Sequence, residues 1–269
     1  MAFSLPQTET EVSSLPPSDC PRRNPKSRIH EFLMEDIRED ILLEAELLLL
    51  SFATGIQDAA AWPDYMCFAS NQTGNTLFLA IGVAGLTHNQ YSFSNIGVSL
   101  SMFVAGGFIL GQLGNLIGVR KRLWLLISNL IQTALVFCAL IVQYSWPIRR
   151  DGPAAMAVIG LLAFSSGGQV AMGRSLKITE ITTAMATAAF VDLVVDPDLG
   201  KLKNRLRNRR VGFLIMLVSG CFVGAFAARE VSSSFPILLC AVGKALVCVG
   251  FLFNRPIKED NRSEEDLKV

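Results

Sequence analysis

The segment NQTGNTLFLAIG, residues 71–82, decides the fold, because it is polar for five residues and then apolar over too short a distance. The apolar chain around it, Thr73 to Leu86, is 14 residues long. A helix rises about 1.5 Å per residue, so this segment reaches only about 21 Å, against ~30 Å for a bilayer core. It either crosses a membrane poorly or enters and returns to the same side.

The rest of the chain favours a polytopic membrane protein. Of the 269 residues, 51% are hydrophobic and 17% are charged, whereas a soluble domain is usually about 25% charged. Six apolar runs cover residues 47–62, 93–119, 123–146, 153–172, 211–228 and 235–254. Five approach the roughly 20 residues that a span needs, and the first does so if its helix begins near Ile41. We expect an all-α, polytopic helical membrane protein.

Polar segments flank this membrane domain. Residues 1–39 and 255–269 have the composition of disordered cytosolic tails, and the first lacks the apolar core of a signal peptide. The membrane domain would then cover residues 40–254, with repeat halves of about 41–146 and 153–254. We expect a multi-pass protein in the plasma membrane rather than in an organelle.

Composition gives no signal for catalysis. The net charge of +1 suggests no nucleic-acid partner. The six cysteines show no CxxC spacing, and the two histidines have no carboxylate cluster around them. We therefore expect no enzyme, no metal and no cofactor. The expected partners are the lipid bilayer and an unknown small solute, and a homo-oligomer is left open.

The distribution of Lys and Arg separates two topologies. A second short segment, Ile181 to Val195, resembles the first in length. If both short segments span, eight spans place 17 basic residues inside and 6 outside, omitting Lys244. If both are re-entrant, six spans place 20 inside and 3 outside. The positive-inside rule favours six spans plus two re-entrant or half-span helices over eight helices.

An internal repeat supports the same count. FATGIQDA, 52–59, and FSSGGQVA, 164–171, share Phe, Gly, Gln and Ala at a constant offset of 112. Two glycine pairs, small-xxx-small faces that allow close helix packing, recur at an offset of 113: Gly107 and Gly111, then Gly220 and Gly224. Packing alone would also explain these glycines. A repeat with three true spans is inverted when copied, and many secondary transporters are inverted repeats with interrupted helices and a site near mid-membrane.

The motif residues resemble those of a known family. Gly55-Ile-Gln-Asp-Ala, followed by Thr73-Gly-Asn-Thr, is similar to the YoaK-like family of small membrane proteins, a domain of unknown function in bacteria and fungi. The second half carries Thr182-Thr-Ala-Met-Ala-Thr, which resembles the family's second motif, and Gln72 replaces the usual Met. The resemblance covers roughly residues 40 to 254. It implies a fold and a membrane location, and no established substrate.

Polar groups around the two short segments are the candidate substrate-binding residues. They are Gln57, Asp58, Asn71, Thr73, Asn75, Thr76, Gln169, Thr182, Thr183 and Thr187. An Asp at the centre of a membrane costs about 2.5 to 3.5 kcal/mol on insertion scales, so Asp58 should face a cavity or a partner, unless it only caps a helix end facing water. The Asn and Thr residues could equally be plain helix caps.

Two charges are candidates for burial. Lys244 lies at the middle of the last apolar run, and a pair with Asp58 or Asp192 would explain it. A solvated position at the cytosolic surface would suit Asp192 equally. These features favour a secondary transporter or permease of a small solute. Coupling of transport to an ion or a proton is left open. The alternative is a non-transporting membrane scaffold or sensor whose short segments only complete the packing.

Overall fold

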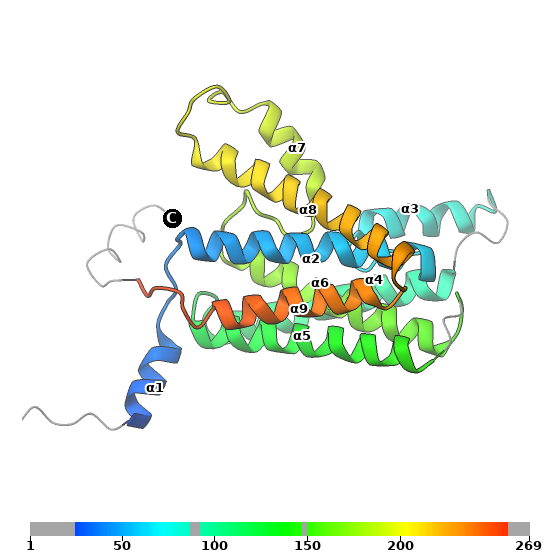
Figure 1. Ribbon diagram of the computed structural model, residues 1–269, viewed down its shortest axis with the longest axis horizontal. Helices are drawn as coiled ribbons and strands as arrows, with labels where there is room; N and C mark the ends of the chain where they lie inside the picture. Colours follow the sequence, from blue (N-terminus) through cyan, green and yellow to red (C-terminus); the bar gives the residue numbers. More distant parts are fainter. Residues whose placement is uncertain (1–24, 87–91, 147–149, 258–269) are drawn as a thin grey trace, which may run out of the picture.

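The computed structural model describes residues 25–86, 92–146 and 150–257, which form a bundle of α-helices (Figure 1). Two isolated β-bridges are the only extended pairing among these residues. The helices are α1 (Pro25–Met34), α2 (Ile41–Tyr65), α3 (Gln72–Val83), α4 (Phe93–Ile117), α5 (Arg122–Ser145), α6 (Pro153–Ser175), α7 (Ala186–Val194), α8 (Arg205–Glu230) and α9 (Phe235–Gly250). The expected all-α architecture is confirmed.

Four helices in the described part of the chain are long and apolar enough to cross a membrane: α4, α5, α6 and α8. This property indicates a membrane protein. The helix α2 has 25 residues and begins at Ile41, as the apolar run required, because the Asp40 carboxylate accepts hydrogen bonds from the N–H groups of Leu42 and Leu43. The helix α9 is apolar but has only 16 residues.

Residues 25–38 are ordered, although the sequence suggested a disordered tail through residue 39. They include α1. Ile37 is 1% exposed, its N–H donates to the carbonyl of Arg120 at 2.9 Å, and it forms an isolated bridge with Pro256. The chain before α2 therefore packs against the end of the chain after α9, because a buried Ile and paired backbone groups hold it there.

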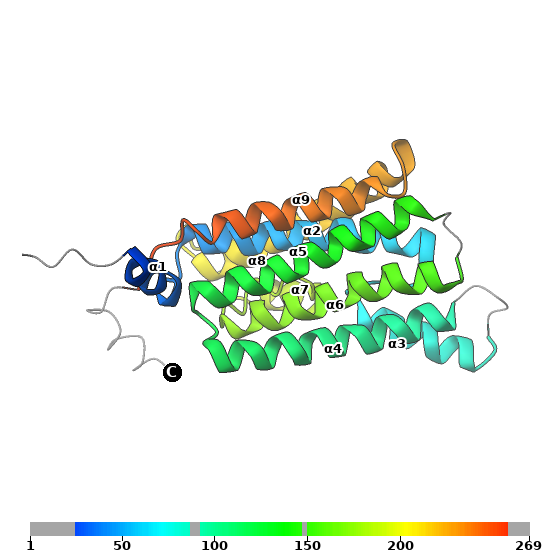
Figure 2. The same ribbon diagram turned by 90° about the horizontal axis from the view of Figure 1, so that it is seen from below.

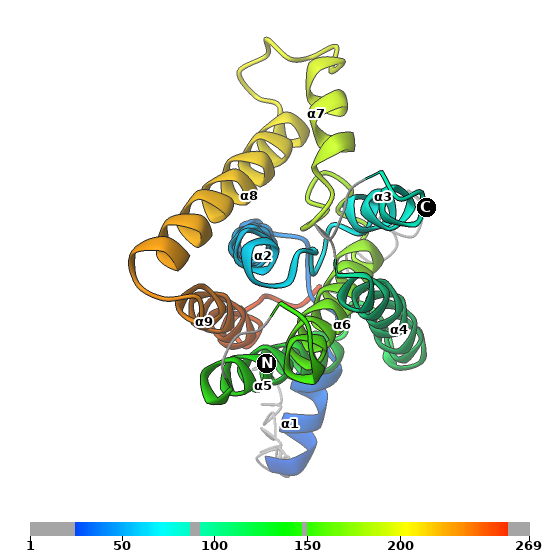
Figure 3. The same ribbon diagram turned by 90° about the vertical axis from the view of Figure 1, so that its right-hand side faces the viewer.

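The helices pack in a reciprocal pattern. The helix α6 contacts both α4 and α5, and α2 contacts both α8 and α9. The pairs α5–α9 and α2–α6 join these two groups, while α3 packs on α4 and α7 packs on α8. The end-on view shows this arrangement (Figure 3). Exchanging α2 with α6, α3 with α7, α4 with α8 and α5 with α9 leaves the pattern of contacts unchanged.

Glycines make the closest crossings in this pattern. A Cβ atom built on Gly220 would lie 2.1 Å from the carbonyl oxygen of Phe52, and one built on Gly106 would lie 2.2 Å from that of Phe164. A Cβ on Gly107 would meet only ordinary contacts, at 3.5 Å or more. Since Phe52 and Phe164 are the counterparts found in the sequence, Gly220 corresponds to Gly106 and not to Gly107. The offset between these helices is 114 rather than 113.

The two short helices run back towards the end of the bundle from which their segments came. The helix α3 starts beside the middle of the bundle and ends at the right-hand end of Figures 1 and 2, where α2 also ends. The helix α7 packs along α8 and ends towards the opposite end, where α8 starts (Figure 1). With 12 and 9 residues, they reach only about 18 and 14 Å.

Ion pairs fix the end of the bundle where α2 and α8 start. Arg209, only 7% exposed, pairs with Glu39, with Glu44 at 2.7 Å and with Glu180 at 3.4 Å. Glu180 belongs to the loop between α6 and α7. One buried guanidinium therefore joins α8 to α2 and to the loop that leads into α7.

The loop between α7 and α8 is held by Asp196. Its carboxylate accepts from the N–H of Asp198 at 2.8 Å and from the amide of Asn204 at 3.1 Å, and it pairs with Arg210 at 3.3 Å. The Asp198 N–H, the Asn204 amide and the nearby Arg210 charge lower the pKa of Asp196 from its ordinary value.

Candidate functional site

A cavity of about 1460 Å³, here called the central cavity, lies where the two short helices begin. Its walls come from α2 between Gly55 and Trp62, from residues 70–74 at the start of α3, from residues 184–188 at the start of α7, and from α8. Phe103 of α4 and the end of α6 complete it. Residues from both the first and the second half of the chain therefore contribute to one space.

Asp58 lines this cavity and binds the neighbouring loop between α2 and α3. One carboxylate oxygen accepts from the N–H groups of Ala69 and Ser70, at 3.0 and 2.8 Å. The other accepts from the Ser70 hydroxyl at 2.5 Å. The loop between α2 and α3 thus folds back over α2 because Asp58 satisfies its buried backbone donors. Asp58 therefore binds the loop between α2 and α3 and does not merely end a helix in water.

Aromatic rings form much of the apolar wall beside Asp58. Trp62, one helical turn after Asp58, stacks on Phe68 with ring centroids 5.1 Å apart. Phe103 and Phe222 reach the same cavity from α4 and α8. None of these rings is among the residues predicted from the sequence. The spacing of four residues between Asp58 and Trp62, which places both on one helix face, is the one signal that could have found Trp62.

Arg174, in the last turn of α6, brings the opposite charge to the cavity. Its side chain is exposed, and its Nη2 donates to the Met185 sulfur at 3.5 Å. Met185 precedes α7, and no side chain caps the N–H groups at the start of that helix. Arg174 is not among the binding residues predicted from the sequence, because nothing local shows that the end of α6 meets the start of α7.

The structure divides the predicted binding residues into two groups. Asp58, Asn71, Thr73 and Thr187 line the central cavity. Gln57, Asn75, Thr76, Gln169, Thr182 and Thr183 do not line it. Asn71 also caps α3, since its side-chain oxygen accepts from the Gly74 N–H at 3.2 Å.

Asn75 is a structural residue in this arrangement. It is fully buried, its oxygen accepts from the Phe68 N–H at 2.8 Å, and its amide donates to the Phe68 carbonyl at 2.8 Å and to Ser99 at 3.1 Å. Its amide group therefore does not face the cavity. It ties the loop between α2 and α3 to the helices α3 and α4.

The three threonines outside the cavity serve the local backbone or core. The Thr76 hydroxyl donates to the Gln72 carbonyl at 2.8 Å, and that of Thr182 donates to the Met185 carbonyl at 2.8 Å. Thr183 is buried with a φ of 61°. These residues shape the short segments without facing the cavity.

Gln57 and Gln169 form reciprocal bonds across the α2–α6 contact. The Gln57 amide donates to the Ser166 hydroxyl at 2.7 Å, and the Gln169 amide donates to the Thr54 hydroxyl at 2.8 Å. Ser166 follows Thr54 at the same offset of 112 that relates the two glutamines. Each half of the molecule therefore repeats the bond that the other half makes.

Lys244 is buried, as predicted, but no carboxylate among the described residues partners it. Its Nζ donates to Gln169 Oε1 at 2.5 Å and to Gln132 Oε1 at 3.2 Å, and its exposed fraction is 1%. The predicted pair with Asp58 or Asp192 is wrong. Asp192 is exposed on α7 and is not a buried charge, because α7 packs only one side against α8. We call Gln57, Gln132, Gln169 and Lys244 the polar core.

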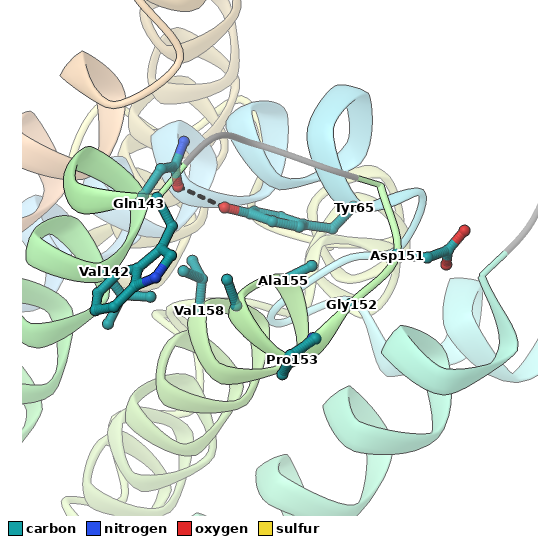
Figure 4. Close-up of a pocket in the computed structure, with 10 residues that line it drawn as sticks. Tyr65, Val142, Gln143, Asp151, Gly152, Pro153, Ala155 and Val158 are labelled. Carbon is teal, nitrogen blue, oxygen red and sulfur yellow. Dashed lines mark hydrogen bonds between the residues drawn. The ribbon is translucent and has the colours of Figure 1, made fainter.

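A smaller cavity, about 230 Å³, lies at the end of the bundle where α2 and α5 end and α6 starts (Figure 4). The Tyr65 hydroxyl crosses it and donates to Gln143 Oε1 at 2.6 Å. Asp151 lies at its edge and points away from Tyr65 (Figure 4). No group of three or more His, Cys, Asp or Glu side chains within the described residues could hold a metal ion.

Comparison with known proteins places the matched region over this whole assembly. The model of one protein family, described as a protein of unknown function (DUF1275), matches residues 47–250, and it confirms the YoaK-like resemblance. No curated protein and no solved structure matches the chain.

Proposed function

The chain belongs to the DUF1275 family, and we propose that it is a secondary transporter or permease of a small solute. The observation that carries this proposal is the central cavity of about 1460 Å³ at the starts of α3 and α7. Broken helices are tolerated at membrane depth only where they are buried in protein or line a water-filled cavity. In secondary transporters, such breaks meet at the solute site.

The proposal includes six spans, formed by α2, α4, α5, α6, α8 and α9. The helices α3 and α7 would be re-entrant, one from each side of the bilayer. Their lengths of 12 and 9 residues, and their return towards opposite ends of the bundle, support this topology (Figure 1). The plasma membrane is the proposed location, which a fluorescent fusion in cells would test.

An inverted repeat is part of the same proposal. The reciprocal helix contacts, the glycine crossings Gly106–Phe164 and Gly220–Phe52, and the paired bonds of Gln57 and Gln169 support it. With inverted halves, rocking about the α2–α6 contact would open the central cavity to one side and then to the other. Proton coupling, if the transporter uses it, is proposed to act through Lys244 at that contact.

The proposal is tested by flux into proteoliposomes. The panel contains labelled amino acids, organic amines, carboxylates and sugars, with protein-free vesicles as the blank. We expect at least one class to enter faster with protein present. Ala188→Trp, which fills the cavity from α7, should slow that flux severalfold. Ala80→Trp, on an exposed face of α3 away from the cavity, is the matched control and should leave the flux unchanged.

The scaffold or sensor reading has one observation in its favour: the bonds of Asp58 and Asn75 are made within the protein. A scaffold needs such bonds only for stability. Vesicles that show no protein-dependent flux of any panel solute, with folded protein in them, would overturn the transporter proposal and leave the scaffold.

A further inference from the structure

We propose that the central cavity binds a small zwitterionic solute of the amino-acid type, with its ammonium group towards Asp58 and its carboxylate towards Arg174. This inference rests on the proposed function and assigns its substrate class. Asp58 and Arg174 are the two residues with full formal charges that line this cavity in the described chain. A solute that carries one charge of each sign matches that lining.

The two charges come from non-equivalent positions of the two sequence halves. At the offset of 112, Val170 is the counterpart of Asp58, and Arg174 is the counterpart of Trp62. All four residues line the cavity. The α2 side therefore presents a carboxylate and an indole where the α6 side presents an isopropyl group and a guanidinium. The lining therefore carries one charge of each sign on different sides, and a dipolar ligand fits it in one orientation.

The α2 side suits an ammonium group. One Asp58 oxygen accepts from two backbone N–H groups and the other accepts from the Ser70 hydroxyl, while a carboxylate has about four lone-pair sites. Trp62 and Phe68 stand beside it, and aromatic faces attract cations, Trp most strongly. An ammonium group there would receive a charge-assisted hydrogen bond and a cation–π contact together.

The α6 side suits a carboxylate. Arg174 has five N–H groups in a planar fork, and the Met185 sulfur that accepts from it is a weak acceptor. A carboxylate can take two parallel bonds from such a fork. The start of α7, which no side chain caps, lies in the same wall and favours negative charge in addition.

The remaining walls suit an apolar side chain. Phe103, Leu217 and Phe222 also line the cavity. Burying an apolar group against them would contribute roughly 25 cal/mol per Å². A solute with an aromatic or large aliphatic side chain is therefore the preferred member of the class.

Three compounds with the same aromatic body test the assignment: L-phenylalanine, 2-phenylethylamine and 3-phenylpropionate. Binding to the purified full-length protein in detergent is measured by titration calorimetry and by the shift in melting temperature. We expect L-phenylalanine to bind about ten- to a hundredfold more tightly than the other two, because each lacks one charge-assisted contact.

Arg174→Gln should remove the advantage of L-phenylalanine over 2-phenylethylamine, and Arg174→Lys should keep part of it. Lys177→Gln, an exposed position nearby that does not line the cavity, is the matched control and should change nothing. Asp58→Asn should remove the advantage over 3-phenylpropionate. If Asp58→Asn does not fold, the Arg174→Gln variant alone tests the assignment. Within the described residues, the Arg174 side chain donates only to the Met185 sulfur, so its replacement should not prevent folding.

Each outcome separates the two proposals. Tight binding of the amine or the acid alone, or an unchanged preference in Arg174→Gln, overturns the zwitterion assignment and leaves transport standing. Charge-dependent binding of L-phenylalanine without flux into proteoliposomes upholds the assignment and overturns transport. The absence of binding by all three compounds overturns the assignment, and flux of another solute class would then still support a permease.

Discussion

At the scale of single residues, the polar core shows how one pair of equivalent glutamines serves two purposes. Gln57 and Gln169 make the same bond to the opposite half, but the oxygen of Gln169 also accepts from Lys244. The oxygen of Gln57 faces the Cys240 thiol instead, at 3.5 Å. A hydrogen bond to a charged group contributes about 1.5–3 kcal/mol, and one between neutral groups about 0.5–1.5 kcal/mol.

Replacing these two glutamines should therefore have unequal effects. We expect Gln169→Leu to lower the free energy of unfolding by about 1–2 kcal/mol more than Gln57→Leu, since it leaves a buried ammonium group short of an acceptor. Adding Lys244→Met to Gln169→Leu should recover part of the loss. Melting of the purified variants in one detergent measures both effects. An equal or larger loss in Gln57→Leu would contradict the role given to Lys244.

At the scale of elements, close helix crossings decide how the bundle is assembled. The helices α4 and α6 meet at Gly106, and α8 and α2 meet at Gly220, with backbone against backbone. Small residues at these points allow the van der Waals contact that holds helices together where lipid supplies no hydrophobic driving force. Neighbouring glycines such as Gly107 make looser contacts. The glycine pattern in the sequence therefore identifies the helix face that packs, but not which glycine of α4 lies at the closest approach.

Two adjacent glycines give a matched test of this point. Gly106→Ala places a methyl group 2.2 Å from the Phe164 carbonyl oxygen, which forces the helices apart and should cost about 1–3 kcal/mol or more. Gly107→Ala meets nothing closer than 3.5 Å and should be neutral or slightly stabilising, since Ala favours helix more than Gly does. Thermal unfolding in detergent compares them, and equal melting temperatures would show that the α4–α6 crossing is not as close as described.

At the scale of the whole molecule, the short helices determine the topology. The helices α3 and α7 run towards opposite ends of the bundle (Figure 1), which supports the proposed inverted repeat. The proposed bilayer arrangement then has both described chain ends, the loop before α5 and the loop between α6 and α7 in the cytosol.

Cysteine labelling distinguishes six spans from eight. In a chain whose native cysteines are replaced by alanine, we expect Asp151→Cys to react with a membrane-impermeant maleimide added to intact cells. Thr179→Cys should react only after permeabilisation, and both residues are exposed. If the chain has eight spans, Thr179→Cys should react in intact cells and Asp151→Cys should react only after permeabilisation. Lys201→Cys lies in the cytosol in either topology and is the control for intact cells.

The sequence by itself indicated an all-α membrane protein and two segments too short to span, but it did not predict α1. These properties follow from the lengths of local apolar runs and from the rise of a helix per residue. Neither depends on contacts between distant parts of the chain. It also indicated the repeat and placed Asp58 at a cavity, because a carboxylate in apolar surroundings needs a partner.

The tertiary structure alone decided which polar groups meet. Asn75 and Gln57 bond within the protein, Lys244 takes amide oxygens instead of a carboxylate, and Arg174 joins Asp58 at one cavity. The physical reason is that the direction of a side chain on a helix selects a neighbour only after the helices have packed, and those neighbours lie up to 183 residues away along the chain.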